Sequence, residues 1–330
     1  MALTSNSKLT SKSKETQAVS GPPVFANSST VCPNKSSVAR SSTLDCTPLA
    51  SIIIPACNEQ LAIKRCLETL LKDALPGEFE TVVVCNGCND GTSDIARAFE
   101  HLGVTVVETS TPSKSRALNI GDRIATQFPR LYLDADIHFS TNDARNLVQF
   151  LSENPLVLAS SPAAAVDTSN CDFLVRAYYR IWTILPYFNE QLLGSGIYSL
   201  SKNGRSLFEQ FPEIVADDEF VRRTVNPSER RKCSVSSFRI SAPRDVRTLL
   251  KVLTRMRLGN RELEYVLPKL AQPVDTSMMT AFFRLACRPK VWPDAPIYLA
   301  IVCLVKWRAY RHWKQSRLIV WHRDETNGRA

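Results

Sequence analysis

The stretch Leu131-Tyr132-Leu133-Asp134-Ala135-Asp136 decides the fold of this chain, because an apolar run ends there on two carboxylates one residue apart. Such a run predicts a buried strand with the carboxylates at its end. Successive side chains of a strand point to opposite faces, so we expect Asp134 and Asp136 on one face, able to hold one divalent ion and a diphosphate. The alternative is a pair of solvated turn aspartates, because a DxD triplet is short and common.

The segments before this stretch repeat the pattern of an apolar run that ends in polar groups. Residues 51–54 lead into Pro55-Ala56-Cys57-Asn58-Glu59, and residues 81–84 lead into Cys85-Asn86-Gly87-Cys88-Asn89-Asp90. Residues 104–107 provide a third strand, and the expected helices are 61–71, 92–99 and 117–128. Strand and helix alternate four times, which predicts an α/β fold with a mostly parallel central sheet and helices on both faces.

Ligands of such sheets bind at the carboxyl ends of the strands. Polar side chains follow three of the expected strands, and they are Asn58 and Glu59, Asn86 and Asp90, and Asp134 and Asp136. We therefore expect these side chains to line one crevice, although they are far apart in the sequence.

Five segments together resemble the inverting family 2 glycosyltransferases, which have the GT-A nucleotide-diphospho-sugar transferase fold. The segments are 54–59, 86–92, 113–119, 134–136 and 216–219. The resemblance covers roughly residues 50–260. It implies an enzyme that moves a sugar from a nucleoside-diphosphate sugar to an acceptor hydroxyl in one metal-assisted displacement.

The resemblance also implies roles for single residues. Asp134 and Asp136 would bind Mg²⁺ or Mn²⁺, which would neutralise the departing nucleoside diphosphate. A carboxylate is common in the family where this chain reads Cys85-Asn86, so the resemblance does not specify uridine. The implied donor-binding residues are Pro55, Ala56, Asn58, Glu59, Asn86, Asp90, Lys114, Arg116 and Asp134.

The reaction itself requires relief of charge, because the leaving group becomes more negative as the anomeric bond breaks. Cations near the diphosphate stabilise the transition state more than the ground state, and Lys114 and Arg116 are candidates. The alternative is an ordinary basic helix start. Arg255 and Arg257 lie in a second basic segment, which resembles a segment that closes over the diphosphate in some relatives. The alternative interpretation of this segment is a solvated basic face of a helix.

The reaction also requires removal of a proton from the acceptor. Asp217, Asp218 and Glu219 follow an apolar stretch, and adjacent acids raise one another's affinity for protons. At a helix start only one of three consecutive side chains can point into the cleft, so we predict Asp218 as the general base, with Asp217 second. The alternative is an acidic first turn that suits the helix dipole.

Two glycines allow close approach of a ligand to the backbone between these sites. We predict that Gly194, Ser195 and Gly196 form a wall of the acceptor pocket, and the alternative is a plain tight turn.

Composition predicts one catalytic domain with two appendages, because 330 residues with 44% hydrophobic content can bury a large core. We expect a disordered Ser/Thr-rich tail at 1–48, the catalytic domain at 49–265 and a basic, aromatic, amphipathic extension at 266–330. No apolar core of a signal peptide is visible, and of ten cysteines only Cys85 and Cys88 form a CxxC pair. These features predict a cytoplasmic protein with free thiols and no zinc site.

The extension carries most of the net charge of +9, with nine Lys or Arg residues and one acid between residues 284 and 323. Its apolar run is about half of the roughly 20 residues that span a bilayer. We expect residues 296–314 to lie on the inner face of a membrane as a peripheral helix, which favours a lipid or glycan acceptor and not nucleic acid. The alternative is a helix that packs against the catalytic domain.

Two other classes remain open. A phosphatase of the haloacid dehalogenase type also combines a DxD at a strand end with a later double aspartate, which Asp134, Asp136, Asp217 and Asp218 can mimic. Its DxD follows the first strand of its catalytic domain, however, whereas three strand and helix units come first here. The other class is a non-catalytic nucleotide-sugar-binding protein. A nicotinamide enzyme is disfavoured because no GxGxxG follows the first strand.

Overall fold

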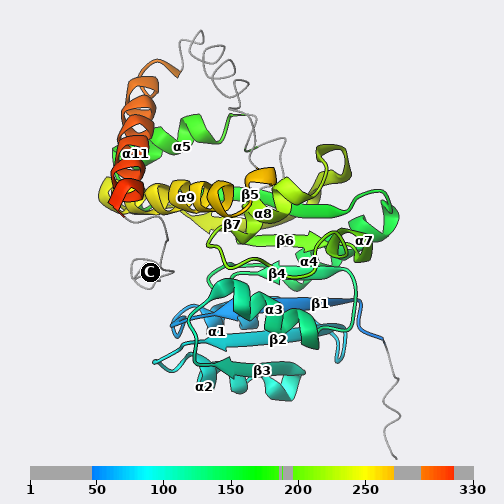
Figure 1. The fold of residues 1–330 in the computed structure, drawn as a ribbon. Coiled ribbons are helices and arrows are strands. Elements are labelled where there is room, and N and C mark those ends of the chain that lie inside the picture. Colours follow the sequence, from blue (N-terminus) through cyan, green and yellow to red (C-terminus); the bar gives the residue numbers. More distant parts are fainter. Residues whose placement is uncertain (1–46, 186–187, 189–195, 271–290, 316–330) are drawn as a thin grey trace, which may run out of the picture. The chain divides into compact units, whose positions relative to one another are not determined.

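A seven-stranded sheet forms the centre of the protein in the computed structural model, which describes residues 47–185, 188, 196–270 and 291–315. The expected tail at 1–48 lies almost wholly outside the described residues. The strands are β1 Ala50–Ala56, β2 Phe79–Asn86, β3 Val104–Thr109, β4 Arg130–Leu133, β5 Ala159–Asp167, β6 Ile197–Leu200 and β7 Arg230–Ser241. Their order is β3-β2-β1-β4-β6-β5-β7, and β6 alone runs antiparallel to its neighbours β4 and β5. The predicted mostly parallel α/β sheet is confirmed (Figure 1).

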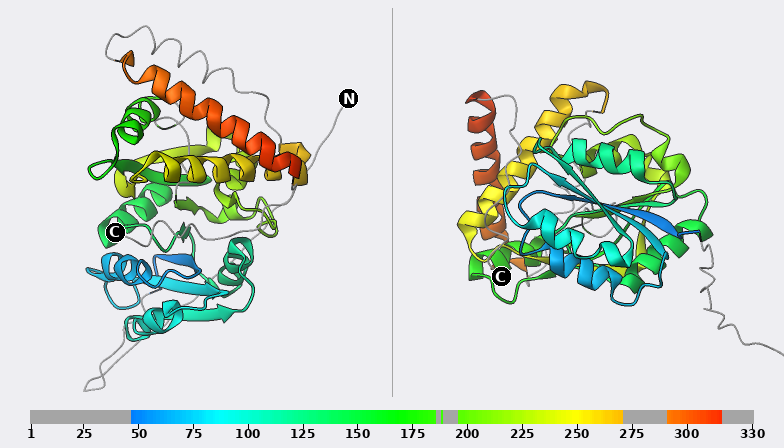
Figure 2. Two further views of the ribbon diagram at one scale, coloured as in Figure 1. Left: turned by 90° about the vertical axis from the view of Figure 1, so that its left-hand side faces the viewer. Right: turned by 90° about the horizontal axis from the view of Figure 1, so that it is seen from below.

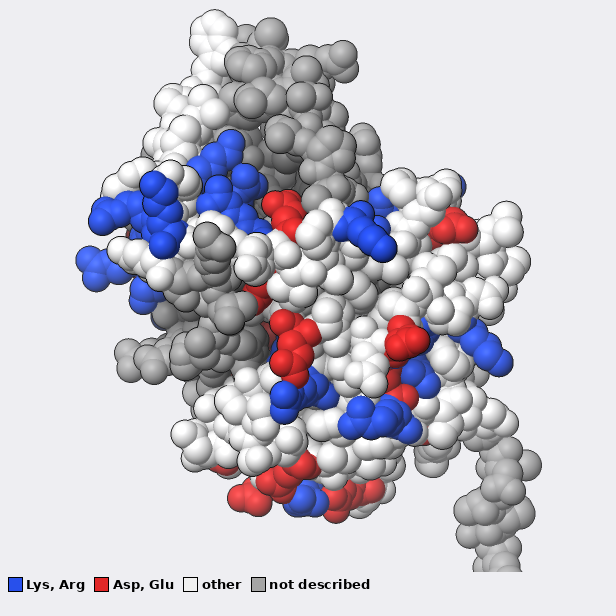
Figure 3. All heavy atoms as spheres, in the orientation of Figure 1, with Lys and Arg blue, Asp and Glu red and all other residues white. Residues whose placement is uncertain are grey.

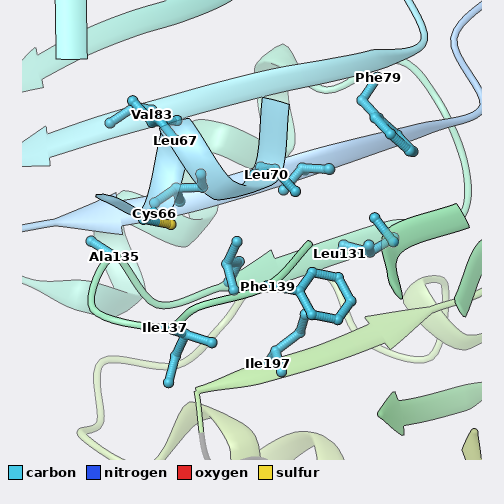
Figure 4. Packing of buried hydrophobic residues seen from close by; sticks show 14 of the residues in the cluster. Cys66, Leu67, Leu70, Phe79, Val83, Leu131, Ala135, Ile137, Phe139 and Ile197 are labelled. Atoms are coloured by element: carbon cyan, nitrogen blue, oxygen red, sulfur yellow. The ribbon is translucent and has the colours of Figure 1, made fainter. Parts of the chain in front are cut away.

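Helices cover both faces of this sheet (Figure 2). They are α1 Ile63–Leu71, α2 Thr92–Arg97, α3 Lys114–Ile124, α4 Thr141–Glu153, α5 Phe173–Trp182, α7 Lys202–Arg205, α8 Asp217–Thr224, α9 Val246–Val266 and α11 Ala295–Gln315. Successive residues of β1 are apolar and point to opposite faces of the sheet, so both faces need a covering layer. Ile52 and Ile54 pack in the cluster that contains α1 and α4, whereas Ile53 packs with Leu118 of α3 on the opposite face. Figure 4 shows the first cluster, in which Leu67 and Leu70 of α1 lie among side chains of the strands such as Val83 and Leu131.

Helix α3 begins earlier than the pattern of apolar residues predicts. The expected helix at 117–128 spans Lys114–Ile124, because the Ser113 side chain accepts a hydrogen bond from the Arg116 N–H and so caps the helix. Lys114 thereby becomes the first residue of α3, at the carboxyl end of the sheet.

Helix α11 packs against α9 and α5. Its inner face buries Tyr298, Ile301 and Val305 in a cluster with residues of those two helices, and the Tyr298 ring stacks on that of Tyr178, with centroids 5.2 Å apart. The inner face therefore agrees with the alternative prediction for residues 296–314, which was a helix packed against the catalytic domain. The extension expected from residue 266 onward is in the same compact unit as the catalytic domain.

The outer face of α11 differs from the inner face. Four large side chains on it are exposed, and they are Leu299, Leu304, Trp307 and Tyr310. Among the described residues, no helix is both long enough and apolar enough to cross a bilayer.

Candidate active site

A pocket of about 370 Å³ lies at the carboxyl ends of β1 and β4, beside α5, α8 and α9. Polar and charged residues of four chain segments form one side, which we call the polar wall. They include Glu59 after β1, Lys114 at the start of α3, Asp134 and Asp136 after β4, and Asp217, Asp218 and Glu219 at the start of α8. The other side, the apolar wall, consists mainly of Tyr178, Tyr179 and Trp182 of α5, Ile240 of β7 and Val252, Leu253 and Met256 of α9.

The two carboxylates of the DxD triplet reach the pocket from a turn, not from a strand. β4 ends at Leu133, and the Ile137 N–H donates to the Asp134 carbonyl oxygen over 3.1 Å, which closes the turn. The expectation that strand pleating would place both carboxylates on one face is therefore wrong, because the strand ends before them. Both still line the pocket, since the turn bends around it.

Gly196, the residue before β6, fixes this turn. Its carbonyl oxygen accepts the Asp134 N–H at 2.7 Å, and its φ of +97° lies in the region that favours glycine. A Cβ here would lie 2.5 Å from Ile137 Cγ1, so no larger residue fits without a shift. Gly196 lines the pocket, whereas Gly194 and Ser195, the other predicted acceptor residues, lie outside the described residues.

Lys114 joins two of the acids. Its Nζ lies 2.7 Å from Asp134 Oδ1 and 3.0 Å from Asp217 Oδ1. Burial disfavours the charged ammonium, but the two carboxylates outweigh it and raise the pKa of Lys114 above its ordinary value. Arg116 lies two residues further along and does not line the pocket. It forms an exposed ion pair with Glu213 at 2.7 Å, so the structure does not bring these two predicted donor-binding cations together.

The three consecutive acids of α8 have different partners. Asp217 is buried, and its Oδ2 accepts the Tyr198 hydroxyl at 3.0 Å, in addition to its ion pair with Lys114. Glu219 forms ion pairs with Arg222 and Arg223, each at 2.6 Å.

Asp218 differs from both neighbours. Within the described part of the chain it forms no ion pair, and its Oδ1 accepts the Glu219 N–H at 2.7 Å. Burial raises the pKa of Asp218 to about 7, and the charge of Asp217 adds to the shift, while Lys114 opposes it. Glu219 shows the opposite shift, because its hydrogen bonds and ion pairs with Arg222 and Arg223 outweigh burial and lower its pKa. Of these two acids, Asp218 therefore binds a proton more strongly.

The pocket carries more negative than positive charge near the DxD turn. Burial raises the pKa of Asp134 to about 6, and Asp217 and Asp136 add to this shift although Lys114 opposes it. Asp134 and Asp136 provide carboxylate oxygens of the kind that suits a Mg²⁺ or Mn²⁺ ion, which takes one or two carboxylates and completes its shell with phosphate oxygens and water. The described residues contain no group of three or more His, Cys, Asp or Glu side chains arranged for a metal, so substrate oxygens would have to complete the site.

Several predicted donor-binding residues do not line the pocket but form hydrogen bonds in the loops next to it. Pro55 and Glu59 line it, but Ala56, Asn58, Asn86 and Asp90 do not. The Asn58 Oδ1 accepts the Asn89 N–H at 2.9 Å, and Asp90 Oδ2 accepts the Gln60 N–H at 3.3 Å.

Asn86 has a similar supporting contact. It is fully buried, and its Nδ2 donates to the Ser113 carbonyl oxygen over 2.9 Å. This bond holds the segment before α3, and hence Lys114, against the end of β2. Asn58, Asn86 and Asp90 therefore connect the loops that follow neighbouring strands instead of facing the pocket.

The apolar wall was not foreseen from the sequence. Its members carry no motif, and their only sequence signal is three aromatic residues within five positions at Tyr178, Tyr179 and Trp182. Such a cluster usually indicates core, and part of it is core: Tyr178 and Tyr179 are buried with α11 behind them.

Comparison with known proteins agrees with this geometry. Residues 51–196, which contain β1 to β4 and the DxD turn, match the model of glycosyl transferase family 2. This segment is a family 2 glycosyltransferase domain. A curated relative, the glycosyltransferase AglE of Haloferax volcanii, is 33% identical over 94 residues, which are 27% of this chain and 31% of that protein. The chain thus aligns with about a third of the length of this relative.

A solved structure shows the fold of the domain. The mannosyltransferase PcManGT of Pyrobaculum calidifontis, solved in complex with GDP-Man and Mn²⁺, is 18% identical with a TM-score of 0.53, over 82% of this chain and 80% of that one. The predicted family and the GT-A fold are confirmed, and the matches indicate a transferase. They favour neither the phosphatase nor the non-catalytic binding protein.

Proposed function

We propose that this protein transfers a sugar from a nucleoside-diphosphate sugar to an acceptor hydroxyl by a single displacement that inverts the anomeric centre. One observation carries the proposal. Lys114, Asp134, Asp136 and Asp218 come from three separate stretches of the chain and line one pocket at the carboxyl ends of the strands. This combination supplies a cation for the diphosphate, carboxylates for a metal and a base for the acceptor.

Asp218 is the proposed general base. An effective base has a pKa near the working pH, and the pKa of Asp218 is raised to about 7. Asp217 is committed to Lys114 and Tyr198, and Glu219 to two arginines, so both act as positioning residues in this proposal. Asp218 removes the proton of the acceptor hydroxyl as its oxygen bonds to the anomeric carbon and the bond to the diphosphate breaks.

Asp134 and Asp136 would hold Mg²⁺ or Mn²⁺, which when bound neutralises charge on the diphosphate. Lys114 adds a second positive charge on the same side, and the Asn86 and Ser113 contacts fix the start of α3 that carries it. We assign Pro55 and Glu59, which line the pocket, to the donor, and the hydrogen bonds of Asn58 to Asn89 and of Asp90 to Gln60 hold the loop that carries Glu59.

We also propose that the acceptor is a membrane lipid or a glycan and that the outer face of α11 binds an anionic membrane surface. Leu299 and Trp307 are exposed on that face, and α11 contains four Lys or Arg residues and no acid. Figure 3 shows Lys and Arg side chains gathered on the side of the molecule where α9 and α11 lie. Exposed aromatic and basic side chains together suit the headgroup region of such a membrane.

Thermal unfolding with a panel of nucleoside-diphosphate sugars tests the donor and metal parts of the proposal. We expect one donor to raise the unfolding temperature in the presence of Mn²⁺ or Mg²⁺, because a ligand of the folded state stabilises it. Asp136→Ala should lose the metal-dependent part of this shift, whereas Asp94→Ala, which removes an exposed acid of α2, should keep it. A full shift in Asp136→Ala would remove that residue from the metal site, and the absence of any shift with every donor would contradict the function.

A further inference from the structure

The apolar wall contains more hydrocarbon than the binding of a nucleotide and a metal requires. Trp182, Ile240, Leu253 and Met256 line the pocket and are only partly buried. Met256 is 45% exposed although it lines the pocket. These side chains leave hydrocarbon surface that a ligand can cover.

The wall is held in place before any ligand binds. The Tyr179 ring meets the rings of Tyr178 and Trp182 edge-on, with centroids 5.3 and 5.6 Å away, and Tyr178 stacks on Tyr298 of α11. Rings in such mutual contact lose little further freedom when a ligand covers them. The wall is therefore a preformed surface.

Four side chains of this wall have no strong hydrogen-bonding group, and they are Ile240, Val252, Leu253 and Met256. Among the other described lining residues of α5, β7 and α9, the polar side-chain groups belong to Tyr178, Tyr179, Trp182, Arg255 and Asn260. A saccharide presents a hydroxyl on most of its carbons, and each buried hydroxyl without a partner has an energetic cost. A hydrocarbon chain has no such requirement and gains from every methylene it buries.

The neighbouring acids restrict the polar end of the same ligand. Asp218, Asp217 and Glu59 lie on the polar wall, and the proposed function assigns the cation of that wall, Lys114, to the diphosphate of the donor. An anionic head would be repelled by this group, whereas an uncharged hydroxyl can donate to Asp218.

We propose that the apolar wall binds the hydrocarbon chain of the acceptor, so that the acceptor is an amphiphile with an uncharged, hydroxyl-bearing head at Asp218 and an apolar chain along α5 and α9. This inference rests on the proposed transferase function for the place of the head. The place of the hydrocarbon chain is inferred from the apolar wall alone and does not depend on that function.

Calorimetric titration of the full chain with methyl, butyl, hexyl and octyl β-D-glucoside, each below its critical micelle concentration, tests the subsite. We expect the affinity to rise by about two- to fourfold for each added methylene. Trp182→Ala and Met256→Gln should flatten this dependence on chain length. Phe173→Ala is the matched control, because Phe173 is an exposed aromatic residue of α5 outside the pocket, and it should behave as the wild type.

Equal affinity for the methyl and octyl compounds would overturn the inference, and so would a chain-length dependence that survives in both pocket variants. Affinity that is independent of chain length but lost in Trp182→Ala would indicate a saccharide stacked on the indole, and would also overturn it. Thermal unfolding with the donor and Mn²⁺, measured on the same samples, separates the two proposals. A donor response without chain-length dependence refutes the subsite alone, and chain-length dependence without any donor response refutes the transferase alone.

Discussion

Hydrogen bonds and ion pairs hold the polar wall of the pocket, whereas packing of rings and aliphatic side chains holds the apolar wall. In the polar wall, several functional groups have specific polar partners, as Lys114 has Asp134 and Asp217. In the apolar wall, the position of α5 depends on α11, which is more than 100 residues away in the sequence, through contacts such as Tyr178 with Tyr298.

This difference determines how each wall should respond to substitution. Loss of one partner in the polar wall changes a charge or leaves a polar group unpaired, so the effect is local and chemical. Loss of packing behind the apolar wall weakens a shared cluster, so the effect is on stability. Substitutions at Asp218, on the two faces of α11 and at Asn58 test this contrast, from the largest expected effect to the smallest.

Asp218→Asn should lower turnover by about 10²–10⁴-fold while donor binding stays intact, because it removes the general base and no ion pair. The pH profile gives a second signature. The raised pKa of Asp218, about 7, means that the carboxyl is protonated below that pH, so the wild-type rate should fall about tenfold per pH unit there, and the variant should lack this limb. Steady-state rates between pH 5 and 9 measure both effects.

Asp94→Asn serves as the control, because Asp94 is an exposed acid outside the pocket, and its profile should match that of the wild type. Turnover near the wild-type level in Asp218→Asn would show that Asp218 is not the general base.

The two faces of α11 should differ when single residues are replaced. Ile301 is 5% exposed on the inner face, so Ile301→Ala should lower the free energy of unfolding by about 2–5 kcal/mol. Leu299 is 45% exposed on the outer face, so Leu299→Ala should change stability by about 0.5 kcal/mol or less. Denaturant titration compares the two variants.

Sedimentation with anionic vesicles completes this comparison. Leu299→Ala combined with Trp307→Ala should reduce pelleting, because both side chains are exposed on the proposed membrane-binding face. Unchanged pelleting would contradict membrane binding by this face. Deletion of residues 296–314 would be less informative, since it would also remove the buried side chains of the inner face.

Substitution of Asn58 should have the smallest effect, and it tests a contact between the loops that support the polar wall. Its φ is +54°, which glycine adopts easily, so Asn58→Gly should remove only the hydrogen bond to the Asn89 N–H and cost about 1 kcal/mol of stability. Asn58→Ala should cost about 1–2 kcal/mol more, because alanine is strained at this φ. Equal stability of the two variants, measured by thermal unfolding, would show that the backbone of this loop relaxes.

Part of the polar wall could be predicted from the sequence because Glu59, Asp134 and Asp136 follow strand ends. An apolar run that stops at Asp134 or Glu59 predicts both the strand and the position of the acid, since the carboxyl ends of parallel strands meet at one edge. Local patterns do not report which acid Lys114 contacts, or that Tyr198 donates to Asp217, because these pairs join distant segments.

The apolar wall could not be predicted by the same reasoning. Leu253 and Met256 have the spacing of any amphipathic helix, and only the position of α9 beside α5 turns that face into the lining of a pocket. The DxD turn falls between these cases. Its residues were identified, but the geometry that presents them depends on Gly196, a residue of a later segment.

The order of strands in the sheet has a consequence for biosynthesis. β1, β2, β3 and β4 pair among themselves, so one continuous length of nascent chain is sufficient to form these ladders while the ribosome is still translating the remainder. β5 pairs in parallel with β7, where Ala159 is opposite Arg230, and it cannot complete that ladder until the later segment has left the exit tunnel. We therefore expect the half that carries the DxD turn to acquire its ladders cotranslationally, before the opposite wall of the pocket exists.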